Sequence, residues 1–92
     1  MKKDELFWQK LIKGDKNAVK EIYQSNVPLL IKYGRRFTND ETIIDDCIVD
    51  LFVNLWENRQ TLNKTGAVKI YLMESLNQAI KAKLKQTHLK RA

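Results

Sequence analysis

The stretch DDCIVDLFVNLWENR, from Asp45 to Arg59, contains the clearest structural signal in this 92-residue chain. Its apolar residues recur at intervals of three and four, the spacing of one face of an α-helix. At about 100° per residue, a single arc of the helix holds the residues that should face the core. We therefore predict an amphipathic helix from about Glu41 to Asn58. Its core arc consists of Ile44, Ile48, Leu51, Phe52 and Leu55.

The other side of this predicted helix combines acidic and apolar side chains. Asp46, Asp50 and Glu57 fall together there, and Val49 and Val53 lie beside them. Six acids and no Lys or Arg occur from residue 40 to residue 57, although the chain as a whole is basic. An exposed apolar shoulder edged by acids favours contact with a basic element of another protein. A helix buried on two sides within a bundle explains the same pattern, and the sequence alone leaves both interpretations open.

The remaining helices follow from periodicity and from residues that end or cap helices. Helices are predicted over residues 4–13, 16–37 and about 67–85, with Gly14 ending the first and Asp15 capping the second. Pro28 removes a backbone hydrogen bond and should kink or split the second helix. The expected fold is all-α, a compact four-helix domain spanning residues 1–92 with core helices over about 4–86. The second helix should direct inward Val19, Ile22, Tyr23, Leu30 and Phe37.

Positive charge is concentrated near the end of the chain. Residues 1–63 carry ten Lys/Arg and ten Asp/Glu, whereas residues 64–92 carry seven Lys/Arg and one Glu, a net charge of +6. This asymmetry indicates an anionic partner, nucleic acid before membrane, although a solvated helix end would show the same charge. The polar arc of the last predicted helix holds Tyr71, Glu74, Gln78, Lys81 and Lys85. The Tyr, Gln and Lys side chains among these can stack on a base, read a base edge and neutralise phosphates.

Enzymatic chemistry finds little support in the sequence. The chain has one His, no Gly-rich phosphate loop, and an Asp45–Asp46 pair whose side chains point to different helix faces. We expect no cofactor and no metal site. One Cys excludes an internal disulfide and fits a reducing cytoplasm. No apolar run approaches the roughly 20 residues of a membrane span, and the N-terminus does not read as a signal peptide, so a cytoplasmic location without membrane contact is expected.

Three stretches resemble region 2 of bacterial sigma-70-type RNA polymerase factors, in the extracytoplasmic-function (ECF) group. They are DDCIVDLFVNLWENR, the later VKIYLMESLNQAIKAKLKQ and the upstream GDKNAVKEIYQSNVPLLIKYGRRFTND. The resemblance covers roughly Leu6 to Gln86, and its most specific part is the Asp-rich helix with its Phe, Leu and Trp. No helix-turn-helix domain follows in this chain, so we expect region 2 alone.

The resemblance implies two partners and assigns residues to each. The acid-edged helix would dock on the clamp helices of the β′ subunit of core RNA polymerase. The last helix and the loop before it would bind the promoter −10 element and hold an unstacked base of the single-stranded non-template strand. An anti-sigma factor is a further candidate partner. By position, the clamp-binding residues would be Asp46, Val49, Asp50, Val53 and Trp56, bordered by Val27 and Leu30. The DNA-binding residues would be Asn63, Lys64, Thr65, Tyr71, Ser75, Gln78, Lys81 and Lys85.

The chain departs from the family pattern at several of these positions. Val49 replaces a Gln of the clamp-binding helix, Asn77-Gln78 replaces an Arg-Asn pair, and Lys85 replaces an Arg. Lys keeps the charge of Arg but not its planar bidentate contact. Clamp docking is therefore better supported than promoter reading. The alternative function is a small helical adaptor that binds a protein through its acidic and apolar face without reading DNA sequence.

Overall fold

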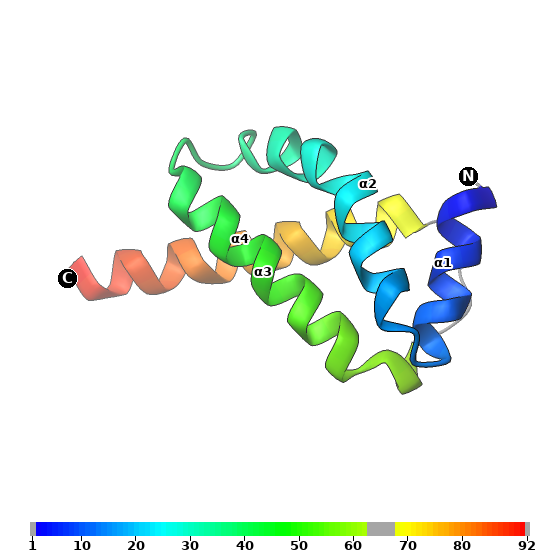
Figure 1. Cartoon of the computed structure of the whole chain (residues 1–92). Coiled ribbons are helices and arrows are strands. Elements are labelled where there is room, and N and C mark those ends of the chain that lie inside the picture. Colours follow the sequence, from blue (N-terminus) through cyan, green and yellow to red (C-terminus); the bar gives the residue numbers. More distant parts are fainter. Residues whose placement is uncertain (1, 63–67, 92) are drawn as a thin grey trace.

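The structure, a computed structural model, describes the backbone of residues 2–62 and 68–91 and the side chains of residues 4–62 and 68–86. Within these ranges the chain forms only helices, so the predicted all-α class is confirmed. Figure 1 shows their arrangement. The elements are α1 (Lys2–Ile12), α2 (Lys16–Gly34), α3 (Glu41–Glu57), the short 3₁₀ helix η1 (Arg59–Thr61) and α4 (Val68–Arg91).

The helices pack around one core rather than as two separate pairs. Helix α1 packs on α2, α2 packs on both α3 and α4, and α3 crosses α4 (Figure 1). Beyond the crossing, the C-terminal part of α4 extends past the other helices. Thus α3 presents one flank toward α2 and the other toward α4, and each flank borders a groove.

Local sequence signals explain where the first helices begin and end. Gly14 has a φ of +97°, a conformation that favours glycine, and it follows the end of α1 as predicted. The Asp15 carboxylate accepts a hydrogen bond from the backbone N–H of Asn17, at 2.9 Å, and so caps α2. Asp40 caps α3 in the same way, accepting from the backbone N–H groups of Thr42 and Ile43.

Helix α2 is continuous through Pro28 and is not split. Figure 1 shows the ribbon bending in its cyan portion, the part of α2 that contains the proline. The helix ends at Gly34, earlier than the predicted end at Phe37. A side chain at position 34 would place its Cβ 3.0 Å from Cγ2 of Ile44 and 3.3 Å from Cδ1 of Ile80. The close approach of three helices therefore favours glycine, which also disfavours continuation of the helix.

The core matches the arcs derived from periodicity. Every residue of the predicted α3 arc is buried, together with Cys47 beside it. Leu72, Leu76 and Ile80 supply the α4 contribution and have no exposed surface. Two further expectations, one for α2 and one for α4, were wrong. Tyr23 is exposed rather than core-facing, and α4 continues to Arg91 instead of ending near Lys85, since its Leu, Lys and Gln residues are good helix formers with no breaker among them.

Candidate functional site

The exposed side of α3 combines large apolar and acidic residues. Val49 and Val53 are 51% and 50% exposed, and Asp46 and Asp50 are exposed beside them. Helix α3 packs on both α2 and α4, yet these side chains stay exposed between the two contacts. The contact of this face with a basic element of another protein remains a prediction. We call Asp46, Val49, Asp50 and Val53 the α3 shoulder.

An apolar groove runs along the flank of the shoulder that faces α2. Its volume is about 400 Å³, and its walls are mainly apolar. Tyr23 packs edge-to-face on Phe52 at the base of the groove, with ring centroids 5.1 Å apart. Tyr23 and Val19 were not predicted as surface residues, although their spacing of four places them on one face of α2. The lining of this α2–α3 groove is Val19, Tyr23, Val49, Phe52, Val53, Trp56 and Glu57.

Trp56 is fixed at one end of the α2–α3 groove by its neighbour Arg59. The Arg59 guanidinium lies over the Trp56 ring, 3.9 Å from its centroid, and its Nη1 donates to the Trp56 carbonyl at 2.9 Å. A cation–π contact of this kind holds the half-buried indole in one orientation. Trp56 thereby forms a rigid wall that a partner side chain could contact.

The two α2 residues expected to border the docking surface lie in different environments. Val27 is partly buried against the core, whereas Leu30 has no exposed surface and is part of the core. The structure therefore places Leu30 beneath the surface, and the α2 residues that line the groove are the partly buried Val19 and the exposed Tyr23.

A second groove, between α3 and α4, brings three of the predicted DNA-binding residues together. Tyr71, Ser75 and Gln78 reach it from α4, and its volume is about 380 Å³. Asp50 and Asn54 of α3 and its C-cap Asn58 contribute polar side chains at intervals of four. Asp50 was predicted to bind the clamp, whereas Asn54 and Asn58 were assigned no role, although this periodicity could have revealed them. The lining of this α3–α4 groove is Asp50, Leu51, Asn54, Leu55, Asn58, Leu62, Tyr71, Ser75, Gln78 and Ala79.

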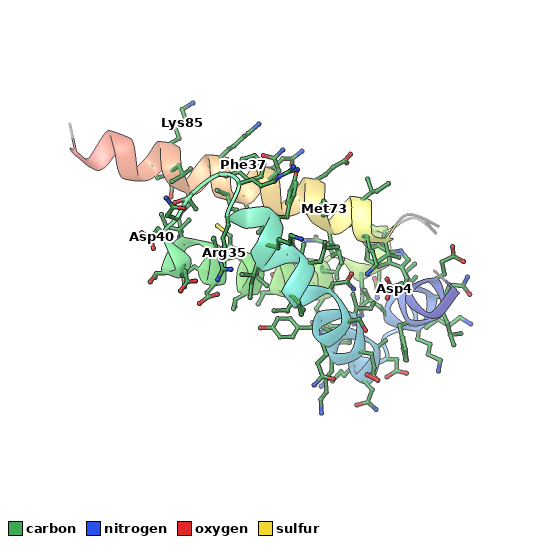
Figure 2. The ribbon with its side chains drawn as sticks, turned by 90° about the horizontal axis from the view of Figure 1, so that it is seen from above. Asp4, Arg35, Phe37, Asp40, Met73 and Lys85 are labelled. Atoms are coloured by element: carbon green, nitrogen blue, oxygen red, sulfur yellow. The ribbon has the colours of Figure 1, made fainter. Side chains whose placement is uncertain are left out.

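The basic residues predicted to contact DNA lie further along α4. Lys81 and Lys85 are exposed and do not line the groove. Figure 2 shows Lys85 pointing away from the bundle on the extended part of α4. The loop residues Asn63, Lys64 and Thr65 lie outside the described residues. The groove and the two lysines together give α4 a polar surface that continues into a positively charged one.

The single cysteine of the chain, Cys47, is a free thiol in the core. Burial raises the pKa of the Cys47 thiol, with a further increase from the carboxylates of Asp50 and Asp46 and an opposing effect of Lys83. The thiol is therefore protonated at neutral pH and is a poor nucleophile. Over residues 4–62 and 68–86, no group of three or more His, Cys, Asp or Glu side chains is arranged to hold a metal ion. None of the helices in the described ranges is both long and apolar enough to cross a membrane.

Comparison with known families agrees with this helical architecture. Residues 22–89 match the family described as Sigma-70 region 2. The chain belongs to this family of bacterial transcription initiation factors. Its region 2 domains bind RNA polymerase and recognise the promoter −10 element, and the family is not one of enzymes. No curated protein and no solved structure matches the chain.

Proposed function

We propose that this chain is the region 2 domain of an ECF-group factor, and that its two grooved surfaces, which meet at Asp50, have different partners. The α3 shoulder and the α2–α3 groove dock on the β′ clamp helices of core RNA polymerase. The α3–α4 groove and the basic part of α4 bind the single-stranded non-template strand of the −10 element. The domain acts in the cytoplasm, where the polymerase is, and an anti-sigma factor that covers the shoulder would compete with docking.

The observation that carries this proposal is the exposure of Val49 and Val53 on the same face of α3 as Asp46 and Asp50. Apolar side chains that are half exposed in the free domain gain stability when a partner covers them. The aspartates beside them attract a basic partner and orient it. A basic coiled coil with apolar side chains along its seam would satisfy both features of the shoulder.

Removing the apolar contacts should weaken polymerase binding by a measurable amount. Val49→Ser and Val53→Ser should each raise the Kd for core RNA polymerase several-fold, because each would forfeit about 1 kcal/mol of apolar burial in the complex. Fluorescence titration of the labelled chain with core enzyme measures this. Leu6→Ser is the matched control, since Leu6 is 52% exposed but belongs to α1. An equal loss of affinity in the control and the two Val variants would reject the shoulder as the docking surface.

The DNA surface is supported by the residues that line the α3–α4 groove. Tyr71 offers a partly exposed aromatic ring, and Asp50, Asn54, Asn58 and Gln78 offer hydrogen-bond acceptors and donors around the same space. A base extruded from the duplex must recover a few kcal/mol of lost stacking and pairing. Stacking on an aromatic ring and polar contacts to the base edge are the interactions that recover it.

Two pairs of substitutions should affect DNA binding in different ways. Lys81→Ala and Lys85→Ala should weaken the binding of all single-stranded oligonucleotides about equally. Each should also reduce the magnitude of the slope of log K against log salt by about 0.7 if its ammonium neutralises one phosphate. Tyr71→Ala and Gln78→Ala should instead reduce the preference for −10-like over scrambled strands, with stacking losses of about 1–3 kcal/mol per base. Anisotropy titrations of labelled oligonucleotides at two salt concentrations distinguish the pairs. Parallel losses of affinity in all four variants would make α4 a purely electrostatic surface.

A second candidate function, the adaptor that does not read DNA sequence, is favoured by one observation on α4. The side-chain oxygen of Asn77 is enclosed and lacks a hydrogen-bond partner among the described residues. This residue stands where the family pattern has an Arg, so a basic contact to DNA is replaced by a side chain whose oxygen does not reach solvent. Tight binding to core polymerase combined with equal affinity for all single strands would favour the adaptor.

A further inference from the structure

Helix α1 precedes the residues that match the family, yet it packs on the first turns of α4. Trp8 of α1 is only 1% exposed and therefore belongs to the rigid core. Its ring meets the ring of Tyr71 in an edge-to-face arrangement, with centroids 5.2 Å apart and an interplanar angle of 69°. Tyr71 is 38% exposed and also lines the α3–α4 groove, so its ring lies between a buried aromatic residue and an open surface.

A polar network anchors the same part of α4 to α1 and α2. The Lys69 ammonium lies 3.4 Å from Oδ2 of the buried Asp4 and donates a hydrogen bond to Oδ1 of Asn26, at 2.9 Å. Asn26, also buried, donates in turn from Nδ2 to the carbonyl of Ile22 within α2. Figure 2 shows Asp4 on α1 beside the start of α4. Because Lys69 precedes Tyr71 by two residues, the network fixes the backbone that carries the tyrosine.

A fixed tyrosine is better suited to stacking than a mobile one. A side chain that is ordered only when a ligand binds loses rotamer freedom at that step, and this loss opposes binding. The Trp8 ring limits the orientations that Tyr71 can adopt, because another rotamer would give up the edge-to-face contact. The orientation seen in the structure keeps the ring at the wall of the α3–α4 groove.

We infer that Trp8 and Asp4 are positioning residues, which hold Tyr71 in place for an unpaired base without contacting the DNA themselves. This inference rests on the proposed reading of single-stranded DNA by the α3–α4 groove. It assigns a role in base selectivity to α1, through Tyr71 and Lys69.

The test measures base selectivity rather than affinity alone. The probes are labelled single-stranded oligonucleotides that differ from a −10-like strand at one base at a time, and selectivity is the spread of their Kd values. Trp8→Leu should reduce this spread about three- to tenfold, the size of one aromatic pair contribution. Trp8→Phe, which keeps an aromatic partner, should retain most of it. Binding of core RNA polymerase should be unchanged in both variants, because α3 is untouched.

A double-mutant cycle separates positioning from general loosening of the fold. If Trp8 acts through Tyr71, the combination of Trp8→Leu with Tyr71→Leu should have the same selectivity as Tyr71→Leu alone. Ile44→Val is the stability control, because Ile44 is buried where α3 begins and packs around Gly34 rather than on α1. It should leave the spread of Kd values unchanged. Asp4→Asn removes the charge facing Lys69 at nearly constant size and should reduce the spread of Kd values, as Trp8→Leu does. If Trp8→Leu fails to fold, the Asp4→Asn variant tests the positioning role.

The possible results are distinguishable. A selective parent chain whose Trp8→Leu and Asp4→Asn variants keep the full spread would overturn the positioning role and leave the proposed function intact. A further loss of selectivity on adding Trp8→Leu to Tyr71→Leu would also overturn it, because Trp8 would then act independently. Equal affinities for all probes in the parent chain would refute promoter reading, and the positioning role together with it.

Discussion

Asp46→Lys combined with Asp50→Lys should abolish binding to core RNA polymerase. Both carboxylates are exposed on the α3 shoulder, where the proposed partner is basic. The double variant would place two ammonium groups against that basic surface, and like charges brought together across an interface cost several kcal/mol. The spacing of four residues leaves a like-charged pair on the helix before and after the change, so the stability of α3 should alter little. Titration of core enzyme and circular dichroism measure the two effects.

The matched control for this double variant changes the net charge equally at other positions. Glu5→Lys combined with Glu21→Lys does so on α1 and α2, away from the α3 shoulder. This control should slightly reduce the long-range electrostatic attraction between the chain and core RNA polymerase, an effect that added salt would screen. The complex should still form. Unchanged affinity in the Asp46 and Asp50 variant would show that the shoulder is not the docking surface.

Phe52→Ala should destabilise the domain by about 3–5 kcal/mol, the usual loss for a buried Phe. Phe52 is buried between α2 and α3, and its ring supports that of Tyr23 at the base of the α2–α3 groove. A domain of this size has a stability of only about 5–10 kcal/mol, so the variant should lose roughly a third or more of it. Urea denaturation followed by circular dichroism gives the free energy of unfolding.

Leu6→Ala provides the comparison for the stability measurement, because Leu6 is half exposed on α1. Its free energy of unfolding should remain within about 0.5 kcal/mol of the parent. A loss below about 1 kcal/mol for Phe52→Ala would mean that α2 and α3 do not enclose Phe52 in this way in solution.

The α3 shoulder was largely predictable because one helix contains the whole signal. The angular positions of Val49 and Val53 follow from helical periodicity, and the excess of acids marks the exposed side. Sequence alone could not show that no other helix of the domain covers the face of α3 that carries Val49, because this depends on where α2 crosses α3. For the same reason Tyr23 was wrongly assigned to the core, since a tyrosine on the α2 face is buried or exposed according to the position of α3.

The α3–α4 groove was only half predictable. Tyr71, Ser75 and Gln78 share the polar arc of α4, but Asn54 and Asn58 come from another helix. Their proximity is a property of the crossing of α3 and α4, which periodicity within one helix does not specify. The contact of Trp8 with Tyr71 joins residues far apart in the sequence and likewise depends on tertiary packing.

The packing around Gly34 limits how this domain tolerates mutation. A methyl group at position 34 would meet Ile44 of α3 at 3.0 Å and Ile80 of α4 at 3.3 Å, so both side chains would have to shift by a few tenths of an ångström to admit it. A defect in transcription mapped to the buried position 34 would thus reflect altered helix spacing where α3 begins, rather than the removal of a partner-binding side chain.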